Sequence, residues 1–208
     1  MDPKQIIEDG YDKIVPRYEQ WSSGADQVLE WFMAELLQRL PRGSDVLELG
    51  CGSGTAAAIL ADGRTYTGVD ISAGQLALAR GRLPKKTFVQ DDLTAISFPD
   101  GSFDAVVAFY VFNHVPRAEQ APAFARIFQW LRPGGRLMLS LGAGDTDDEV
   151  QADWLGVPMF FAGFEPTVNE RSLGDAGFEL ELSDTRSQIE EGEGEVTFHW
   201  VIARKPGS

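Results

Sequence analysis

A glycine-rich loop between a short strand and a helix constrains the fold of this chain more than any other feature. The run from Val46 to Thr55 reads VLELGCGSGT and carries glycine at alternate positions, Gly50, Gly52 and Gly54. Glycine has no Cβ, so the backbone there can turn tightly and approach a ligand closely. In open α/β sheets, ligands bind in the crevice at the carboxyl ends of the strands. The loop therefore predicts an α/β sheet with a ligand site where this strand ends.

Short β-branched runs alternate with helical segments from Asp45 onward, which is typical of a doubly wound α/β fold. Strands separated by helix-length connections pair in parallel, so we predict a mostly parallel sheet. An S-x-x-D signal at Ser23 and Asp26 marks the start of the first of these helices. The expected strands are 46–49, 66–69, 87–90, 103–108 and 136–141, and the expected helices are 27–40, 55–61, 75–81 and 117–131.

The last part of the chain has a different pattern. A short helix is expected at 172–176, followed by strands at 178–185 and 196–204. The Gly/Glu-rich run 190–195 joins these two strands directly, which predicts an antiparallel hairpin at the edge of the sheet.

The charge of the chain argues against a nucleic acid or an anionic membrane as partner. Eighteen Lys and Arg residues stand against 32 Asp and Glu residues, which gives a formal net charge of −14. Nucleic-acid binding depends on Lys and Arg that neutralise phosphates. No apolar leader or membrane-length apolar stretch is visible, and Cys51 is the only cysteine, so we expect a cytoplasmic protein.

No metal site is expected. One cysteine and two histidines are too few for a zinc site of the usual kind. The acidic run 145–149 has the oxygen ligands that magnesium prefers, but nothing in the sequence fixes an octahedral geometry. We interpret it, like the Gly/Glu-rich run, as a solvated loop.

An acidic residue at the end of the second strand fits either of two cofactor classes. Asp70 lies 20 residues after Gly50, where a carboxylate could hold ribose hydroxyls in dinucleotide-binding proteins as well. Three details disfavour a dinucleotide. Thr55 occupies the position of the last glycine in the dinucleotide pattern, Glu48 precedes the first glycine by two residues, and no Tyr-x-x-x-Lys pair occurs anywhere.

Five segments in order resemble the motifs of class I S-adenosylmethionine-dependent methyltransferases. The resemblance is strongest to the small-molecule branch that includes ubiquinone and menaquinone methyltransferases, the methyltransferase type 11-like proteins. It covers about Tyr11 to Leu141 and weakens from Gly142 onward. The matching segments are Glu48–Gly54 (ELGCGSG), Gly68–Ser72 (GVDIS), Gln90–Leu93 (QDDL), Phe98–Val107 (FPDGSFDAVV) and Leu131–Arg136 (LRPGGR).

The resemblance implies one domain with a Rossmann-like methyltransferase fold. Its doubly wound, mostly parallel sheet would have seven strands, two of them in the C-terminal antiparallel hairpin. An N-terminal helical lid would span 1–43, the cofactor-binding core 44–141, and a substrate-side segment with the hairpin 142–208. For the aromatics around Tyr11–Trp21 the alternative to a lid is that they fasten the helix at 27–40 to the sheet.

The resemblance also implies S-adenosylmethionine as the cofactor. The glycines would let the backbone run beside its methionine part, and Asp70 would accept hydrogen bonds from the ribose hydroxyls. Asp92 would accept from the adenine amino group, although the adjacent Asp91 leaves the register open. The implied cofactor residues are Tyr11, Glu48, Gly50, Cys51, Gly52, Gly54, Asp70, Ile71, Gln75, Asp92, Leu93 and Phe109.

Methyl transfer from a sulfonium depends mainly on holding the acceptor in line with the methyl group and on excluding water. A general base is needed only for a weakly acidic acceptor. His114 follows the fourth strand and is the candidate base, and the alternative is that it only hydrogen-bonds a nearby loop. His199 lies within the last strand and is expected to be structural, and Cys51 is expected to pack rather than react.

Aromatic side chains are the candidates for binding the acceptor. The expected acceptor residues are Tyr18, Trp21, His114, Trp154 and Phe160. The aromatic segment 154–164 suggests a planar or lipophilic small molecule, and core packing or a homodimer interface is its alternative. Two other functions also fit the sequence. They are a non-catalytic module that binds S-adenosylmethionine and a nicotinamide-dependent oxidoreductase.

Overall fold

The structure is a computed structural model, and it describes residues 2–22, 24, 26–190, 192 and 194–207. Its elements in chain order are α1 Pro3–Trp21, α2 Gln27–Gln38, β1 Asp45–Leu49, α3 Ala57–Leu60, β2 Thr65–Asp70, α4 Ala73–Arg82, β3 Thr87–Gln90, β4 Phe103–Ala108, a 3₁₀ turn Phe112–His114, α5 Arg117–Trp130, β5 Leu131–Gly142, β6 Thr146–Trp154, β7 Val157–Gly163, α6 Pro166–Asp175, β8 Glu179–Glu190 and β9 Gly194–Arg204.

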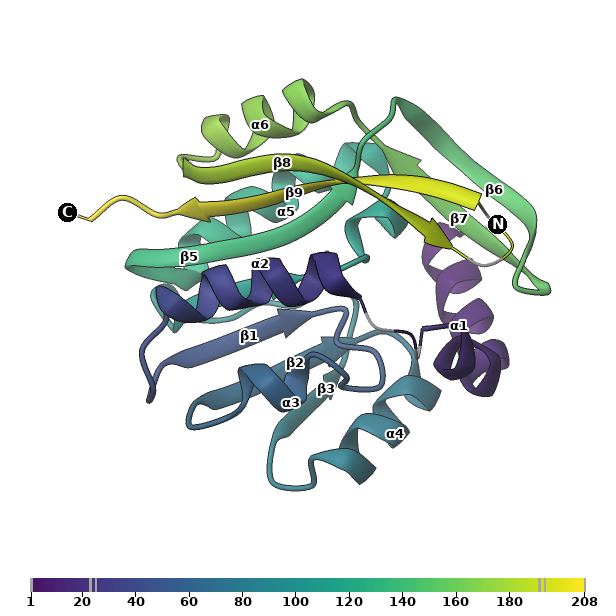
Figure 1. Cartoon of the computed structure of the whole chain (residues 1–208), viewed down its shortest axis with the longest axis horizontal. Coiled ribbons are helices and arrows are strands. Elements are labelled where there is room, and N and C mark those ends of the chain that lie inside the picture. Colours follow the sequence, from purple (N-terminus) through teal and green to yellow (C-terminus); the bar gives the residue numbers. More distant parts are fainter. Residues whose placement is uncertain (1, 23, 25, 191, 193, 208) are drawn as a thin grey trace.

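Seven strands form one sheet in the order β3-β2-β1-β4-β5-β9-β8 (Figure 1). Strands β1 to β5 pair in parallel, and β9 is antiparallel to both β5 and β8. The predicted fold, a doubly wound sheet extended by an antiparallel C-terminal hairpin, is therefore confirmed. Strand β9 lies inside the sheet between β5 and β8, so the segment that was predicted to be on the substrate side also completes the core.

Helices cover both faces of the sheet, and each face has its own apolar core (Figure 1). On one face α2 and α3 pack on the strands around Phe32, Leu36 and Trp200, which are fully buried. On the other face α5 and α6 pack around Phe124 and Ile127. Strands that are apolar on both sides are typical of a covered parallel sheet. Helix α2 thus belongs to the core, and of the predicted lid only α1 lies across the carboxyl ends of the strands.

Helix α1 docks on the molecule through a small apolar cluster with the β6–β7 hairpin. Ile6, Ile7 and Ile14 are buried there. Gly10 makes the close approach of α1 to β7 feasible, because a Cβ at this position would lie 2.8 Å from the Met159 Cε atom. The packing brings α1 close to the sheet edge where the ligand site is expected.

Several element boundaries differ from the prediction. The β6–β7 hairpin was not expected, and the acidic run that was predicted to be a solvated loop lies mostly in β6. Arg117 pairs with Asp145 at 2.6 Å and with Asp147 at 2.8 Å, and its backbone nitrogen donates to Asp148. Helix α3 is shorter than predicted and α6 is longer, and β5, β8 and β9 each extend beyond the predicted residues.

The start of α2 is fixed by Asp26 itself. Its Oδ1 atom accepts a hydrogen bond from the Leu29 backbone nitrogen at 2.8 Å, as expected of an N-cap residue. Ser23, the other half of the predicted start signal, lies outside the described residues.

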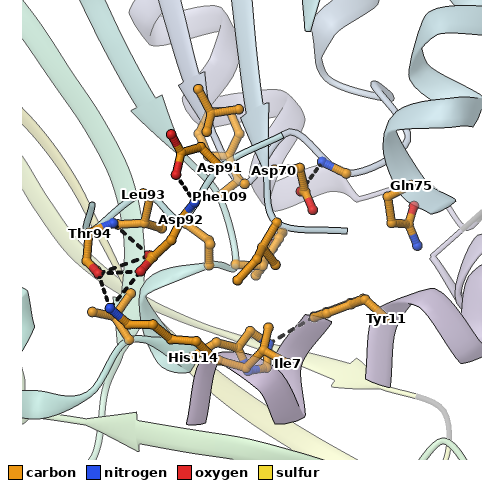
Figure 2. A pocket seen from close by; sticks show the side chains of 18 of the residues that line it. Ile7, Tyr11, Asp70, Gln75, Asp91, Asp92, Leu93, Thr94, Phe109 and His114 are labelled. Carbon is orange, nitrogen blue, oxygen red and sulfur yellow. Dashed lines mark hydrogen bonds and ion pairs between the residues drawn. The ribbon is translucent and has the colours of Figure 1, made fainter. Parts of the chain in front are cut away.

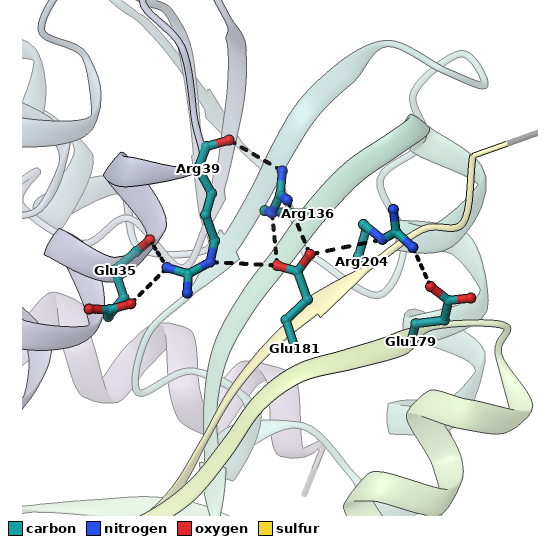
Figure 3. Close-up of polar contacts among 6 residues, drawn as sticks. All are labelled: Glu35, Arg39, Arg136, Glu179, Glu181 and Arg204. Carbon is teal, nitrogen blue, oxygen red and sulfur yellow. Dashed lines mark hydrogen bonds and ion pairs between the residues drawn. The ribbon is translucent and has the colours of Figure 1, made fainter.

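An ion-pair cluster fastens α2 to the edge of the sheet away from the ligand site (Figure 3). Arg136 of β5 binds Glu181 of β8 in a bidentate pair, at 2.9 and 3.1 Å. Arg39, at the end of α2, lies 3.8 Å from the same carboxylate and also pairs with Glu35. Arg204 of β9 completes the cluster. Within the described residues, no helix is both long and apolar enough to cross a bilayer.

Candidate active site

The carboxyl ends of β1, β2 and β4, together with the segment after β3, surround a cavity of about 750 Å³, including the space at its mouth. Helix α1 contributes residues to the same cavity (Figure 2). Nine of the twelve predicted cofactor residues line it, namely Tyr11, Gly50, Gly52, Asp70, Ile71, Gln75, Asp92, Leu93 and Phe109. The structure therefore brings most of the predicted set together around one space.

The three glycines of the loop after β1 have different surroundings, which favour glycine for different physical reasons. All three have positive φ, at 68°, 50° and 82°. A Cβ on Gly50 would lie 2.6 Å from the Val111 side chain, and one on Gly54 would lie 3.3 Å from the Ala79 Cβ. The nearest atom to a Cβ on Gly52 is 4.0 Å away, so this residue faces open space. Gly50 and Gly54 allow close packing, and Gly52 leaves room for a ligand.

Asp70 ends β2 and is held by the backbone around it. Its Oδ2 atom accepts from the Gly52 nitrogen at 2.7 Å, and its Oδ1 atom accepts from the Ser72 nitrogen at 2.9 Å. Burial raises the pKa of Asp70 to about 6, and the backbone hydrogen bonds oppose that rise. The carboxylate is thus oriented at the cavity wall, with acceptor capacity left for a ligand.

Gln75 is the residue with the most direct sign of an expected ligand. It lines the cavity from α4 and is only 1% exposed. Its amide oxygen and nitrogen are both buried without a hydrogen-bond partner among the described residues. Because buried amide groups are almost always hydrogen-bonded, the two atoms indicate a polar ligand beside them.

Asp91, Asp92 and Leu93 all line the cavity. Both carboxylates that the sequence offered for the adenine amino group therefore lie at the site. Lys4 of α1 pairs with Asp92 at 2.6 Å, and Thr94 donates to the same carboxylate. Burial acts to raise the pKa of Asp92, but these hydrogen bonds outweigh it and lower the pKa. Lys4 and Thr94 also line the cavity, and no pattern in the sequence pointed to them.

Glu48, Cys51 and Gly54 do not line this cavity, although all three were predicted to contact the cofactor. Glu48 is buried beneath the loop, where its Oε2 atom accepts from the Tyr66 hydroxyl at 2.5 Å. Burial raises the pKa of Glu48 to about 8 and raises the pKa of the Cys51 thiol as well. Glu48 therefore supports the loop from below, and Cys51 fits the predicted packing position, not a nucleophile.

His114 lies in the 3₁₀ turn after β4 and is 5% exposed. Its Nδ1 atom lies 2.8 Å from the Phe160 carbonyl oxygen, so Nδ1 carries the proton and donates it. The Tyr11 hydroxyl lies 2.9 Å from Nε2 and donates to it. Burial lowers the pKa of His114 to about 4, so the ring is neutral at physiological pH.

A second, larger cavity of about 1910 Å³, including the open space at its mouth, adjoins the first. The four residues Tyr11, Tyr18, Tyr110 and His114 line both. Of the other predicted acceptor residues, Trp21 and Trp154 line the second cavity. Tyr11, Tyr18 and His114 thus lie where the two spaces join, and the Trp154 ring of β6 lies 6.1 Å from the His114 ring.

Phe160 is an exception among the predicted acceptor residues. It is 2% exposed and lines neither cavity, and Phe161 lines the second one in its place. Successive side chains of a strand point to opposite faces, so the two neighbours in β7 have opposite environments. The backbone of Phe160 still contributes, through the carbonyl that holds His114.

Tyr110 is a site residue that sequence reasoning missed. It has a φ of 55°, which is uncommon for a residue other than glycine. Its backbone nitrogen donates to the Ser140 hydroxyl at 2.8 Å, and its own hydroxyl donates to Asp26 at 2.5 Å. Strained residues of this kind gather at functional sites, and the only signal in the sequence was its place directly after Phe109.

His199 is structural, as predicted. It is 1% exposed in β9, and its Nε2 atom lies 2.8 Å from the Ser183 hydroxyl. Across the parts of the chain that the structure describes, no group of three or more His, Cys, Asp and Glu side chains is arranged to hold a metal ion.

Comparison with known proteins places this site in a family. A family model described as a methyltransferase domain matches residues 46–135, which include the glycine loop and Asp70. The demethylmenaquinone methyltransferase of Beutenbergia cavernae is 36% identical over 138 residues, which are 62% of this chain and 55% of that protein. Residues 46–135 thus match a methyltransferase domain, and these relatives support the resemblance to the class I S-adenosylmethionine-dependent methyltransferases. The match favours a methyltransferase over the nicotinamide-dependent oxidoreductase that the sequence had left as an alternative.

Two further matches cover more of the chain. The 2-methyl-6-phytyl-1,4-hydroquinone methyltransferase of Synechocystis is 38% identical over 176 residues, or 82% of this chain and 54% of that protein. The solved structure of magnesium protoporphyrin IX methyltransferase from Synechocystis, with bound S-adenosylmethionine, has a TM-score of 0.77 at 20% identity and covers 99% of this chain and 98% of that one. That likeness shows the shared fold. The chain spans about half the length of the first curated relatives that it matches.

Proposed function

We propose that the chain catalyses the transfer of a methyl group from S-adenosylmethionine to a small-molecule acceptor. One observation carries this proposal. The cavity at the glycine loop opens beside a second, aromatic cavity, and Tyr11, Tyr18, Tyr110 and His114 line both. A cofactor in the first space and an acceptor in the second would therefore meet at these residues, as an in-line displacement requires.

The residues of the first cavity fit S-adenosylmethionine. Gly52 leaves open space beside the loop, and Gln75 presents two buried amide atoms that need partners. Asp70 would accept from the ribose hydroxyls, and Asp92 or Asp91 would accept from the adenine amino group. Ile71 and Leu93 would supply apolar surface for the adenine ring, and Phe109 would line the methionyl arm.

When bound, the cofactor supplies a methyl group on a positively charged sulfur, which keeps the electron pair of the broken bond while the acceptor's lone pair forms the new one. Tyr11 and His114 then offer a route for a proton that the acceptor releases. The Tyr11 oxygen would take that proton while its own passes to the His114 Nε2 atom. Because the pKa of His114 is about 4, its ring holds a proton only briefly. His114 therefore mainly positions Tyr11, and the proximity of acceptor and methyl group supplies most of the catalysis.

Labelled S-adenosylmethionine tests the function directly. Incubation of the protein with cofactor carrying a labelled methyl group and a panel of aromatic phenols and amines should transfer label to at least one acceptor, with one equivalent of S-adenosylhomocysteine formed per methyl group. The Asp70→Ala variant should lose most of this transfer. Tight binding of S-adenosylhomocysteine without transfer to any acceptor would instead favour the non-catalytic binding module.

We further propose that the acceptor is a small molecule, that neither a nucleic acid nor a membrane is a partner, and that the protein acts in the cytoplasm. The net charge of −14 and the single cysteine support these proposals. A homodimer is proposed as well, and light scattering on the purified protein tests it.

A further inference from the structure

One wall of the second cavity consists almost entirely of aromatic rings. Tyr18 lies 5.7 Å from Trp21 and 6.1 Å from Trp154, measured between ring centroids. The Trp154 ring lies 5.9 Å from Phe161 and 5.8 Å from Tyr11. These rings come from α1, β6 and β7, which are far apart in sequence. The faces of Trp and Tyr rings attract cations, most strongly where water is excluded.

The remaining polar lining of this cavity combines neutral amide and hydroxyl groups with negative charge. Asp26 and Glu190 contribute carboxylates, and among the described residues that line the cavity there is no lysine or arginine. The negative charge reaches the aromatic wall. Burial is the main cause of the raised pKa values of Tyr11 and Tyr18, and Glu190 adds to both increases.

A buried acceptor atom in this lining has no partner. The Asn113 Oδ1 atom is buried and forms no hydrogen bond within the described part of the chain, and its amide nitrogen lies 3.5 Å from the His114 Nε2 atom. Because a buried acceptor without a donor is costly, this atom indicates a ligand that brings an N–H or O–H group.

From these three features we infer that the second cavity binds an acceptor molecule that carries a protonated amine on an aromatic or apolar skeleton. The aromatic wall receives the skeleton and the cation, and the carboxylates of Asp26 and Glu190 balance its charge. A carboxylate or phosphate of the same size would lose its hydration without meeting a positive side chain, so the cavity discriminates against it. That the ligand is a methyl acceptor rests on the proposed function. The binding preference does not.

Three matched probes test this inference. They are 4-phenylbutylamine, 4-phenylbutanol and 4-phenylbutyrate, which share one skeleton and differ in charge. Each is titrated calorimetrically into the whole protein, with and without saturating S-adenosylhomocysteine, and quenching of tryptophan fluorescence gives a second readout because Trp21 and Trp154 line the cavity. The amine should bind roughly tenfold more tightly than the alcohol, and the butyrate should bind more weakly than both.

The Glu190→Gln variant sharpens the test. It should weaken binding of the amine by roughly fivefold and leave binding of the alcohol unchanged. Asp100→Asn is the matched control, because it removes an exposed carboxylate before β4, at the opposite end of the strands.

The outcomes separate this inference from the proposed function. Equal binding of the three probes, tighter binding of the butyrate, or no measurable binding at millimolar concentration overturns the inference. Failure of S-adenosylhomocysteine to bind overturns the proposed function instead, and the amine preference is then judged from the titration without it.

Discussion

The two cavities of this protein are built in different ways. The first lies at the carboxyl ends of consecutive parallel strands, and short segments following β1, β2, β3 and β4 supply most of its lining. The second is assembled from α1, the β6–β7 hairpin and the ends of β8 and β9. The cofactor side therefore depends on local backbone geometry. The second cavity, the proposed acceptor side, depends on long-range packing.

The charge buried on the two sides also differs. Under the glycine loop, Glu48 is a carboxyl group whose pKa burial raises to about 8. Between the cavities, His114 is a base whose pKa burial lowers to about 4. Glu48 lowers the stability of the folded protein as the pH rises above the ordinary pKa of glutamate. His114 lowers that stability as the pH falls below the ordinary pKa of histidine.

The largest expected effect concerns Glu48, beneath the glycine loop of the first cavity. Between the ordinary glutamate pKa of 4.5 and about 8, the unfolded chain ionises Glu48 while the folded protein keeps it protonated. Each pH unit in that window costs about 1.4 kcal/mol of stability. The side chain introduced by Glu48→Gln cannot ionise. The variant's free energy of unfolding in urea should therefore rise relative to that of the parent protein, by roughly 3 kcal/mol in total from pH 5 to pH 8.

The matched control for Glu48 is Glu149→Gln, which alters an exposed carboxylate in β6. Its stability should stay within about 0.5 kcal/mol of the parent at every pH. If Glu48→Gln gained nothing between pH 5 and pH 8, Glu48 would be ionised in the folded protein.

At the junction of the cavities, Tyr11→Phe and His114→Ala should each slow methyl transfer about 10²-fold. The reason is that the Tyr11 hydroxyl donates to His114, so the two act as one unit, and the double variant should lose little more than either alone. Single-turnover kinetics with an accepted substrate gives the rates. Calorimetry with S-adenosylhomocysteine should show nearly unchanged affinity for the His114→Ala variant.

Two other results would change the role of His114. If rate and cofactor affinity fell together, His114 would only shape the pocket. If the rate stayed normal, positioning of the acceptor alone would account for catalysis.

Within the cofactor cavity, Asp70→Ala should weaken binding of S-adenosylhomocysteine by about tenfold to hundredfold. Hydrogen bonds to a charged acceptor contribute about 1.5–3 kcal/mol. Since the pKa of Asp70 is about 6, the parent protein should also bind more weakly at pH 5 than at pH 8, where the carboxylate is ionised. Calorimetry measures both effects, Asp100→Asn serves as the control, and an unchanged affinity would remove Asp70 from the site.

The smallest expected effect concerns α1, which contributes to both cavities. Polar contacts tie it to α4, since Asp12 accepts from the Ser72 hydroxyl at 2.5 Å and from the Gly74 nitrogen at 2.9 Å, and Glu19 pairs with Arg82. If α1 is a lid, hydrogen exchange at 13–21 should be fast without ligand. S-adenosylhomocysteine should slow it by roughly tenfold, as the closed arrangement becomes favoured.

Asp12→Ala should reduce the protection that ligand gives to α1 and leave exchange in the strands unchanged. Equal protection of α1 with and without ligand would show that it is a fixed part of the structure, in which its aromatics serve only to pack.

The sequence by itself determined the parallel sheet, the terminal hairpin and most of the cofactor cavity. These features depend on short-range signals. A glycine with positive φ is needed where Gly50 turns, and an acid at the end of β2 must lie near that turn, because parallel strands end at the same edge of the sheet. Gly50, Asp70 and Gln75 could therefore be placed from spacing and resemblance.

The β6–β7 hairpin escaped prediction for a local physical reason. Its two-residue turn has positive φ at both Leu155 and Gly156, an arrangement usually marked by Asn-Gly or Asp-Gly. Strand β6 is also mostly exposed, so it lacks a regular apolar alternation. Without the hairpin, no rule of the sequence decides which of Phe160 and Phe161 faces the acceptor.

Only the tertiary structure decided the rest of the site. Burial makes Glu48 a support beneath the loop, and the sequence shows a carboxylate but not its surroundings. The Tyr11–His114 contact joins residues 103 positions apart, and the aromatic wall joins α1 to a hairpin more than a hundred residues later. Such pairings depend on how packed elements meet in space, and local propensity carries no information about them.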